Sequence, residues 1–233
     1  MRISLTPRRS KTRGFTLTEL AIVFGAMGAI IAAIWVAAGT VSDNNKAYLT
    51  AQQIGRVTQN IREYYMNAQG IPPAACSGAD VTAALDTNGL FPAEMRSGTV
   101  GVINSAYATS ATGSFRVKGP SCPGTSSRFW IVLTNLTPAA CARLLFSGIN
   151  YQDQSMGITA VCGASETSTT TPCYSGTAGT GTTGGWFNIK CLNGVCDTYT
   201  QTGTHVPLTL PQAQTLCSSA STSEVGWEFK LRD

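Results

Sequence analysis

The chain has 233 residues, of which 43% are hydrophobic and only 12% are charged, and its formal net charge is +4. Five of the 16 basic residues lie within the first 14 positions, so the rest of the chain carries 11 basic and 12 acidic side chains. This balance argues against a protein that binds nucleic acid through bulk positive charge. The length beyond an N-terminal segment is sufficient for one domain with its own core.

A basic stretch and one acid precede a long apolar run at the N-terminus. No charged residue occurs in residues 20–42, a run of 23 positions. At about 1.5 Å per residue, a helix of this length covers about 34 Å, enough to cross a hydrocarbon core of about 30 Å. Glu19 stands immediately before this run, and an ionisable side chain at such a depth is a functional candidate. The preceding basic residues are Arg2, Arg8, Arg9, Lys11 and Arg13.

This order of basic leader, Gly-Phe-Thr-Leu-Thr-Glu (residues 14–19) and apolar helix resembles the class III signal of type IV prepilins. In that family a prepilin peptidase cleaves after the glycine and methylates the new N-terminus, and the fifth mature residue is glutamate. The resemblance places the cut between Gly14 and Phe15 and gives Glu19 the glutamate's role in assembly. It implies a leader at residues 1–14, a helix at 15–68 whose membrane or fibre-core part is about 15–42, and a head domain at 69–233.

Other N-terminal signals explain these residues less well. An ordinary secretory signal has an apolar core of about 7–15 residues that ends in its cleavage site, whereas this run is longer and its expected cut precedes it. A simple signal anchor accounts for a basic N-terminus facing the cytoplasm but leaves Glu19 unexplained. The pair Arg8-Arg9 lacks the consensus of a twin-arginine signal around it.

The sequence predicts one continuous helix over residues 15–68, because no proline interrupts it. Its first half is apolar on all sides, and its second half is amphipathic. The expected apolar face, at alternating spacings of four and three, consists of Ala47, Ala51, Ile54, Thr58, Ile61, Tyr65 and Ala68. The other positions hold Asp43, Lys46, Gln53, Arg56, Asn60 and Glu63. Pro72-Pro73 ends the helix.

The remaining chain predicts short helices and strands. Expected helices are residues 80–86, 139–146 and 210–217, expected strands are 113–118, 129–134 and 225–230, and a hairpin is expected at 186–200 about Asn193-Gly194. The strand at 129–134 is continuously apolar and is therefore expected inside the sheet. Thr137 and Pro138 are the expected cap and first turn of a helix. Residues 165–185 are rich in Ser, Thr and Gly and predict a long surface loop.

These elements predict an α+β fold, in which a long N-terminal α-helix packs on an antiparallel β-sheet. The resemblance makes this the type IV pilin fold, stabilised by disulfides. Residues 89–95, Gly-Leu-Phe-Pro-Ala-Glu-Met, resemble the equivalent place in type IVb pilins. That subclass has larger head domains.

Eight cysteines, the first of them Cys76, lie in the part expected outside the cytoplasm. An even number in that position predicts four disulfides in an oxidising compartment. A metal site is not expected, because no Cys-x-x-Cys occurs and His205 is the one histidine of the chain.

Eight cysteines allow 105 full pairings, so the sequence only ranks candidates. Cys191 and Cys196 would face each other in the predicted hairpin, with Cα atoms about 4.5 Å apart. Cys162 and Cys173 bracket the first part of the Ser/Thr-rich loop. Cys141 and Cys217 lie on predicted helices, and joining them resembles the C-terminal disulfide region of type IVb pilins. Cys76 and Cys122 are then left to each other.

No catalytic constellation emerges from the sequence, so neither an enzyme nor a cofactor is expected. There is no Gly-Lys-Ser/Thr phosphate loop and no Gly-x-Ser-x-Gly elbow, and His205 lies in a Ser/Thr-rich stretch. Direct contact with nucleic acid is also not expected, because the aromatics Phe129 and Trp130, next to Arg128, belong to a predicted core strand.

The resemblance implies a structural subunit, a major pilin, of an extracellular type IV pilus. Its implied partners are further copies in a helical homopolymer, the prepilin peptidase, the inner-membrane assembly machinery and, before assembly, the membrane. The precursor would lie in the bacterial inner membrane with a cytoplasmic leader and a periplasmic head. Two alternatives stay open: a minor pilin or secretion-system pseudopilin, and a membrane-anchored adhesin that does not polymerise.

Overall fold

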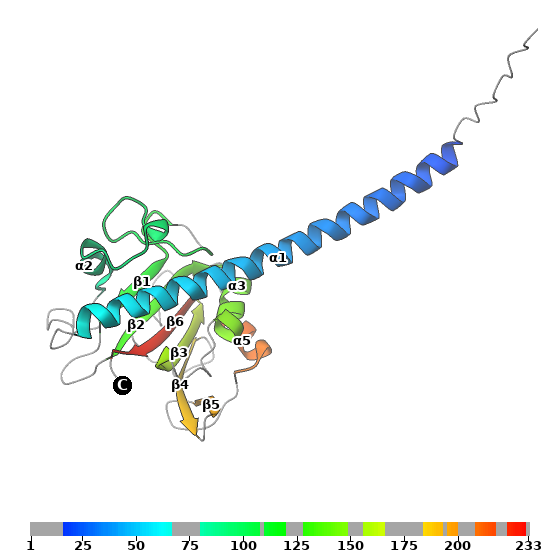
Figure 1. Ribbon diagram of the computed structural model, residues 1–233. Coiled ribbons are helices and arrows are strands. Elements are labelled where there is room, and N and C mark those ends of the chain that lie inside the picture. The colour runs from blue at the N-terminus through cyan, green and yellow to red at the C-terminus, as the bar shows by residue number, and fades with distance from the viewer. Residues whose placement is uncertain are drawn as a thin grey trace, which may run out of the picture. The chain divides into compact units, whose positions relative to one another are not determined.

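The computed structural model describes residues 16–66, 80–107, 110–119, 128–148, 156–165, 184–192, 195–199, 208–217 and 223–231 (Figure 1). The chain divides into two compact units, Met1–Ser42 and Asp43–Asp233. One uninterrupted helix, α1 (Leu17–Met66), contributes to both units. The predicted helix at 15–68 is therefore confirmed over the described residues. Positions 15, 67 and 68 lie outside them.

The apolar part of α1, up to Ser42, exposes its large hydrophobic side chains. Leu17, Trp35 and Val36 are 85%, 75% and 74% exposed. By its length and composition α1 could cross a membrane. An exposed apolar surface of this kind is typical of a segment that contacts lipid or other protein.

The second unit is built on one antiparallel sheet (Figure 1). Its described strands are β1 (Phe115–Lys118), β2 (Arg128–Leu136), β3 (Ile158–Ser165), β4 (Gly184–Leu192), β5 (Val195–Tyr199) and β6 (Ser223–Lys230). Their spatial order is β1-β2-β6-β3-β4-β5. The last strand of the chain thus lies in the interior of the sheet, between β2 and β3.

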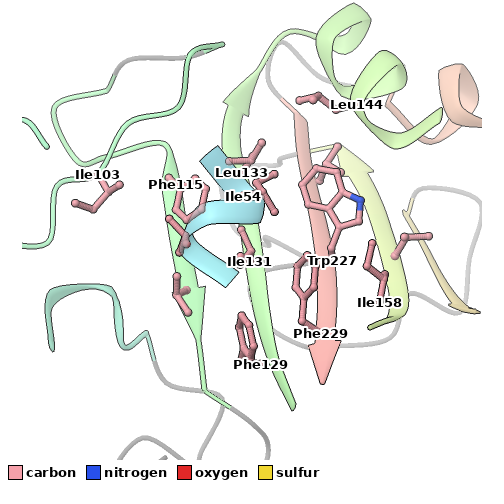
Figure 2. Close-up of a cluster of buried hydrophobic side chains, with 14 of the residues drawn as sticks. Ile54, Ile103, Phe115, Phe129, Ile131, Leu133, Leu144, Ile158, Trp227 and Phe229 are labelled. Atoms are coloured by element: carbon pink, nitrogen blue, oxygen red, sulfur yellow. The ribbon is translucent and has the colours of Figure 1, made fainter. Parts of the chain in front are cut away.

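The amphipathic half of α1 packs its apolar face on this sheet, as predicted. Ile54 and Ile61 are at most 1% exposed, and Thr58 and Tyr65 are also buried, whereas Ala47 and Ala51 are half-buried. Figure 2 shows Ile54 over the side chains that β1 and β2 direct toward the helix, with Trp227 of β6 beside them. The α+β arrangement of a long helix on an antiparallel sheet is therefore present.

Three polar side chains of α1 also bind the backbone of the second unit. The Asn60 amide donates a hydrogen bond to the Leu90 carbonyl (2.8 Å), and Gln53 Oε1 accepts one from the Ala106 amide (3.2 Å). Arg62 donates to the carbonyls of Met156 (2.8 Å) and Lys230 (2.9 Å). These bonds align the helix against the sheet and against the segments around residues 90 and 106, so the predicted polar positions are not uniformly exposed.

The short helices agree with the sequence in place, with shifted ends. α2 (Thr82–Thr87) begins two residues later than predicted, because Asp80 forms a β-bridge with Lys118 and accepts a hydrogen bond from the Thr82 amide (2.8 Å). α5 (Leu210–Cys217) has the predicted bounds. Asn88 and Gly89 form a turn after α2, in which Gly89 has a φ of 75°.

α3 is shorter than the predicted helix at 139–146. It covers Pro138–Arg143, and a π-helical turn, η3 (Leu144–Gly148), follows. Thr137 caps α3 as expected, because its hydroxyl accepts a hydrogen bond from the Ala140 amide (3.2 Å). In the wider turn the consecutive residues Leu144 and Leu145 are both buried in the core.

Among the described strands, β3 is the one that the sequence analysis does not predict. It pairs with β6 on one side and β4 on the other, and Gly163 lies against Leu145. Ser165 ends β3 and Gly184 begins β4, so both ends of the predicted loop at 165–185 are strand. The hairpin of β4 and β5 is confirmed, while its predicted turn Asn193-Gly194 lies outside the described residues.

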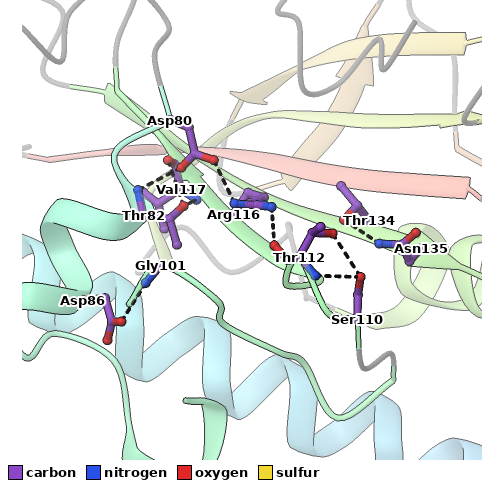
Figure 3. A network of polar contacts seen from close by, with 10 residues as sticks. All are labelled: Asp80, Thr82, Asp86, Gly101, Ser110, Thr112, Arg116, Val117, Thr134 and Asn135. Carbon is purple, nitrogen blue, oxygen red and sulfur yellow. Dashed lines mark hydrogen bonds and ion pairs between the residues drawn. The ribbon is translucent and has the colours of Figure 1, made fainter. Parts of the chain in front are cut away.

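The loop region beside β1 is held by polar contacts, some of which Figure 3 shows. Asp86 is buried, pairs with Arg96 Nε (2.9 Å) and accepts a hydrogen bond from the Gly101 amide (2.9 Å). A 3-10 turn, η2 (Ala93–Met95), lies within this region. Asp80 pairs with Arg116 (3.2 Å) at the edge of the sheet. These contacts order the segment after α2, and the side chain of Asn60 in α1 donates its hydrogen bond to a carbonyl of the same segment.

Replacing Gly157 by alanine is expected to lower the free energy of unfolding by about 3 kcal/mol, of which about 1–2 kcal/mol is backbone strain and the rest lost hydrogen bonding. Gly157 has a φ of 60°, and an added Cβ would lie 2.5 Å from Arg62 Nη2, so the guanidinium would have to leave its two carbonyls. Urea unfolding measures the loss. Gly98→Ala is the control, because Gly98 has a φ of 88° with open space around it. Equal losses in both variants would remove Arg62 from the explanation.

Candidate functional site

The first turn of α1 contains a reciprocal cap between Thr16 and Glu19. The Thr16 amide and hydroxyl both donate hydrogen bonds to Glu19 Oε2 (2.9 Å each), and the Glu19 amide donates one to the Thr16 hydroxyl (3.3 Å). This is a capping box, in which two residues satisfy amides that have no partner within the helix. The sequence analysis missed Thr16, although the signal, Thr-x-x-Glu before an apolar run, is present.

The cap leaves Glu19 able to interact with another chain. Both residues are exposed, and Glu19 Oε1 has no hydrogen-bond partner among the residues that the structure describes. A carboxylate has room for several donors on its two oxygens. The other predicted processing residues, Gly14 and Phe15, lie outside the described residues, so the structure gives no geometry for the expected cut.

A second group of contacts surrounds the first residues of the second unit. The Tyr107 hydroxyl donates to the Asp43 carbonyl (2.9 Å), and Arg143 lies 3.4 Å from Asn44 Oδ1 and 3.7 Å from the Asp43 carboxylate. Burial raises the pKa of Tyr107, the nearby Arg143 cation lowers it, and Asp43 raises it further. These contacts hold α1 at Asp43 and Asn44, immediately after its charge-free run.

The Cys141–Cys217 disulfide joins α3 to α5 and confirms the predicted pair. The Cα atoms are 5.9 Å apart, the two residues are separated by 76 positions, and both are fully buried. A covalent link between elements so far apart in sequence ties the C-terminal part of the chain to the middle of the head.

The structure describes the other predicted pairs only in part. Cys162 is disulfide-bonded, but its predicted partner Cys173 lies outside the described residues. Cys76 and Cys122 also lie outside them. Cys191 and Cys196 are opposite each other in the β4–β5 register, as the predicted pair requires. The pairing of these six cysteines remains a prediction.

Replacing both Cys141 and Cys217 by alanine is expected to lower the free energy of unfolding by about 4 kcal/mol, because the disulfide closes a long loop of the unfolded chain. The measurement is denaturant unfolding of the oxidised protein. The matched control is Cys191→Ala with Cys196→Ala, which would open a loop of only a few residues and should lower the stability by about half as much. A larger loss in the control than in the Cys141/Cys217 variant would contradict the loop argument.

The basic side chains near β1 and β2 are engaged with acids of the same chain. Arg128 pairs with Glu228 (3.2 Å), and Arg116 pairs with Asp80 (3.2 Å). Lys118 is buried, which lowers its pKa, while Glu224 and Asp80 act in the opposite direction. The two ion pairs therefore join β2 to β6 and β1 to Asp80, which precedes α2. In the described part of the chain, no group of three or more His, Cys, Asp or Glu residues could hold a metal ion.

No model of a known protein family matches this chain, and no curated protein matches it either. Two features bear on the function: the capped, apolar and exposed start of α1, and the disulfide-bonded α+β unit in which the second half of α1 packs on the sheet.

Proposed function

We propose that this chain is the structural subunit of an extracellular type IV pilus, made as a prepilin and polymerised through α1. The proposal rests on one combination of features. The sequence Gly-Phe-Thr-Leu-Thr-Glu (residues 14–19) stands at the start of an apolar run. The helix that begins at Leu17 is apolar and exposed up to Ser42, and its second half packs on a disulfide-bonded antiparallel sheet. A secretory signal or a plain membrane anchor requires no glutamate at that position and no second half built into a domain.

In this proposal the precursor lies in the inner membrane with its leader in the cytoplasm and its head in the periplasm. A prepilin peptidase removes residues 1–14, and the assembly machinery moves the apolar helix from lipid into a bundle of identical helices. Lipid tails are as apolar as these side chains, so close packing and polar contacts must drive the transfer, not the hydrophobic effect. The charge of Glu19 must be matched in the fibre, because an unpaired carboxylate in an apolar bundle is strongly destabilising. The new amine of Phe15, on the same or a neighbouring copy, is the cation expected at that depth.

Subunit counting in sheared surface filaments tests the proposal. Filaments are detached, purified and quantified by mass spectrometry, with the membrane fraction analysed in parallel. A major pilin is expected to be the most abundant protein of the filaments and to start at Phe15. A trace amount in filaments built of another protein would make it a minor pilin or pseudopilin. Its complete retention in the membrane, without filaments, would favour the anchored adhesin.

A further inference from the structure

The side of α1 opposite the sheet carries a regular stripe of exposed residues within the second unit. They recur at spacings of four, three, four, three and four, and we call them the outer stripe: Asn45, Leu49, Gln52, Arg56, Gln59 and Glu63. All six are exposed. This alternation places residues along one line of a helix, as in the seam of two packed helices. The buried face of α1 has the same spacing, with Ile54 and Ile61 at its centre, and lies on the other side.

The outer stripe holds two charges of opposite sign, Arg56 and Glu63. They are seven residues apart, about 10 Å along the helix, which is too far for an ion pair within one chain. Glu63 forms no ion pair with any residue that the structure describes. Arg56 lies 3.3 Å from Glu94, but the two side chains are 62% and 54% exposed. An ion pair as solvated as this contributes little, so Arg56 can take another partner.

We infer that the outer stripe is the surface along which α1 helices of neighbouring subunits pack, with Arg56 of one copy paired to Glu63 of the next. The inference rests on the proposed function, since it requires parallel copies in a fibre. Such an interface is heterologous, with a different residue from each copy at every contact. Opposite charges at a fixed spacing set the register of helices that pack side by side. The amides of Asn45, Gln52 and Gln59 supply hydrogen bonds along the same line.

The charge order at the two ends of α1 agrees with a single shift between copies. Arg56 precedes Glu63 by seven residues, and the expected amine of Phe15 precedes Glu19 by four. When each pair joins two copies, the copy that supplies the cation is displaced toward the C-terminal end of the copy that supplies the acid, by about 10 Å for Arg56–Glu63 and about 6 Å for Phe15–Glu19 at helical rise. The length and freedom of the Arg56 side chain cover the difference. All copies are identical, so a change of conformation between the two ends of α1 would occur in every copy. The shift between neighbouring copies would then be the same at both ends of α1.

Charge reversal with a reciprocal swap tests the pair. Arg56→Glu and Glu63→Arg are each expected to lower the yield of sheared filaments about tenfold, because each places like charges opposite one another in every contact. The double variant restores the attraction and is expected to return the yield to near that of the natural chain. Lys46→Glu is the matched control, since it makes the same charge change off the stripe at an exposed residue. Glu94→Gln, which removes the internal partner of Arg56, is expected to assemble normally.

The outcomes separate this inference from the proposed function. If the natural chain forms no filaments, the proposed function fails. If it does and the single reversals assemble normally, or if the double variant fails to restore assembly, the Arg56–Glu63 pair is overturned.

A second measurement tests the pair in filaments that do assemble. Filaments of Arg56→Lys, treated with a carbodiimide, are expected to contain a cross-linked peptide that joins positions 56 and 63 of different copies. Mixed isotope labelling identifies copies, and absence of that peptide also overturns the pair.

Discussion

Replacing Gly14 by leucine is expected to leave the chain as an uncleaved precursor and to abolish filaments. A glycine lets another backbone approach closely because it has no side chain, and the resemblance gives this residue the position before the cut. Without cleavage, the basic leader stays attached, and its charges resist passage out of the cytoplasm. The nitrogen of Phe15 would also remain an amide, so the expected cation for Glu19 would not exist.

Mass spectrometry of the N-terminus in membranes and in sheared filaments measures this effect. The natural chain should begin at methylated Phe15 in the filaments, and the Gly14→Leu chain should retain its leader in the membrane. Ser10→Leu is the control, since it introduces the same side chain into the same leader away from the cut. Filaments whose subunits start at any residue other than Phe15 would sink the cleavage site.

Replacing Glu19 by glutamine is expected to preserve cleavage and to lower filament yield about a hundredfold, the equivalent of about 3 kcal/mol of lost pairing. Glutamine has the same shape, and its amide oxygen can accept the hydrogen bonds that Glu19 Oε2 accepts from Thr16. The start of the helix should therefore remain capped while the charge is lost. Subunits beginning at Phe15 should accumulate in the membrane.

Thr16→Val provides the complementary control, because it removes the hydroxyl of the capping box and keeps the charge of Glu19. A lost helix cap is worth about 1 kcal/mol, so this variant should assemble with a much smaller reduction in yield. The measurement is the ratio of the chain in sheared filaments to that in membranes, by quantitative immunoblotting. Normal yield from Glu19→Gln, or an equal loss from Thr16→Val, would show that capping and not charge is what assembly needs.

Local patterns in the sequence predicted the places of the helices, although the ends of α2 and α3 differ from the prediction. The alternation of four and three between Ala47 and Tyr65 predicted which side of α1 is buried, since that face depends only on helical geometry. The cap of α3 by Thr137 and the bounds of α5 were also predicted correctly, because each depends on residues within one or two turns. The Cys141–Cys217 pair was expected from the resemblance as well as from the placement of the two helices.

The sequence analysis failed where an element depends on distant partners. Gly157 precedes strand β3 and Gly163 lies within it, and the strand is stable because β6 and β4 flank it. The sequence also did not predict that β6 lies inside the sheet, because a strand at the edge of a sheet can have the same alternating pattern. No local pattern predicts that Arg62 binds the carbonyls of Met156 and Lys230, which are far from it in the sequence.

The sequence by itself determined the long helix, its charge-free run, the position of Glu19 and the side of α1 that faces a core, because spacing along one helix defines all of them. Only the tertiary structure decided the strand order and the binding of Arg62 to the carbonyls of Met156 and Lys230. The reason is physical: backbone geometry repeats locally, whereas strand pairing and the accessibility of a charged side chain depend on which remote residues fill the space around it.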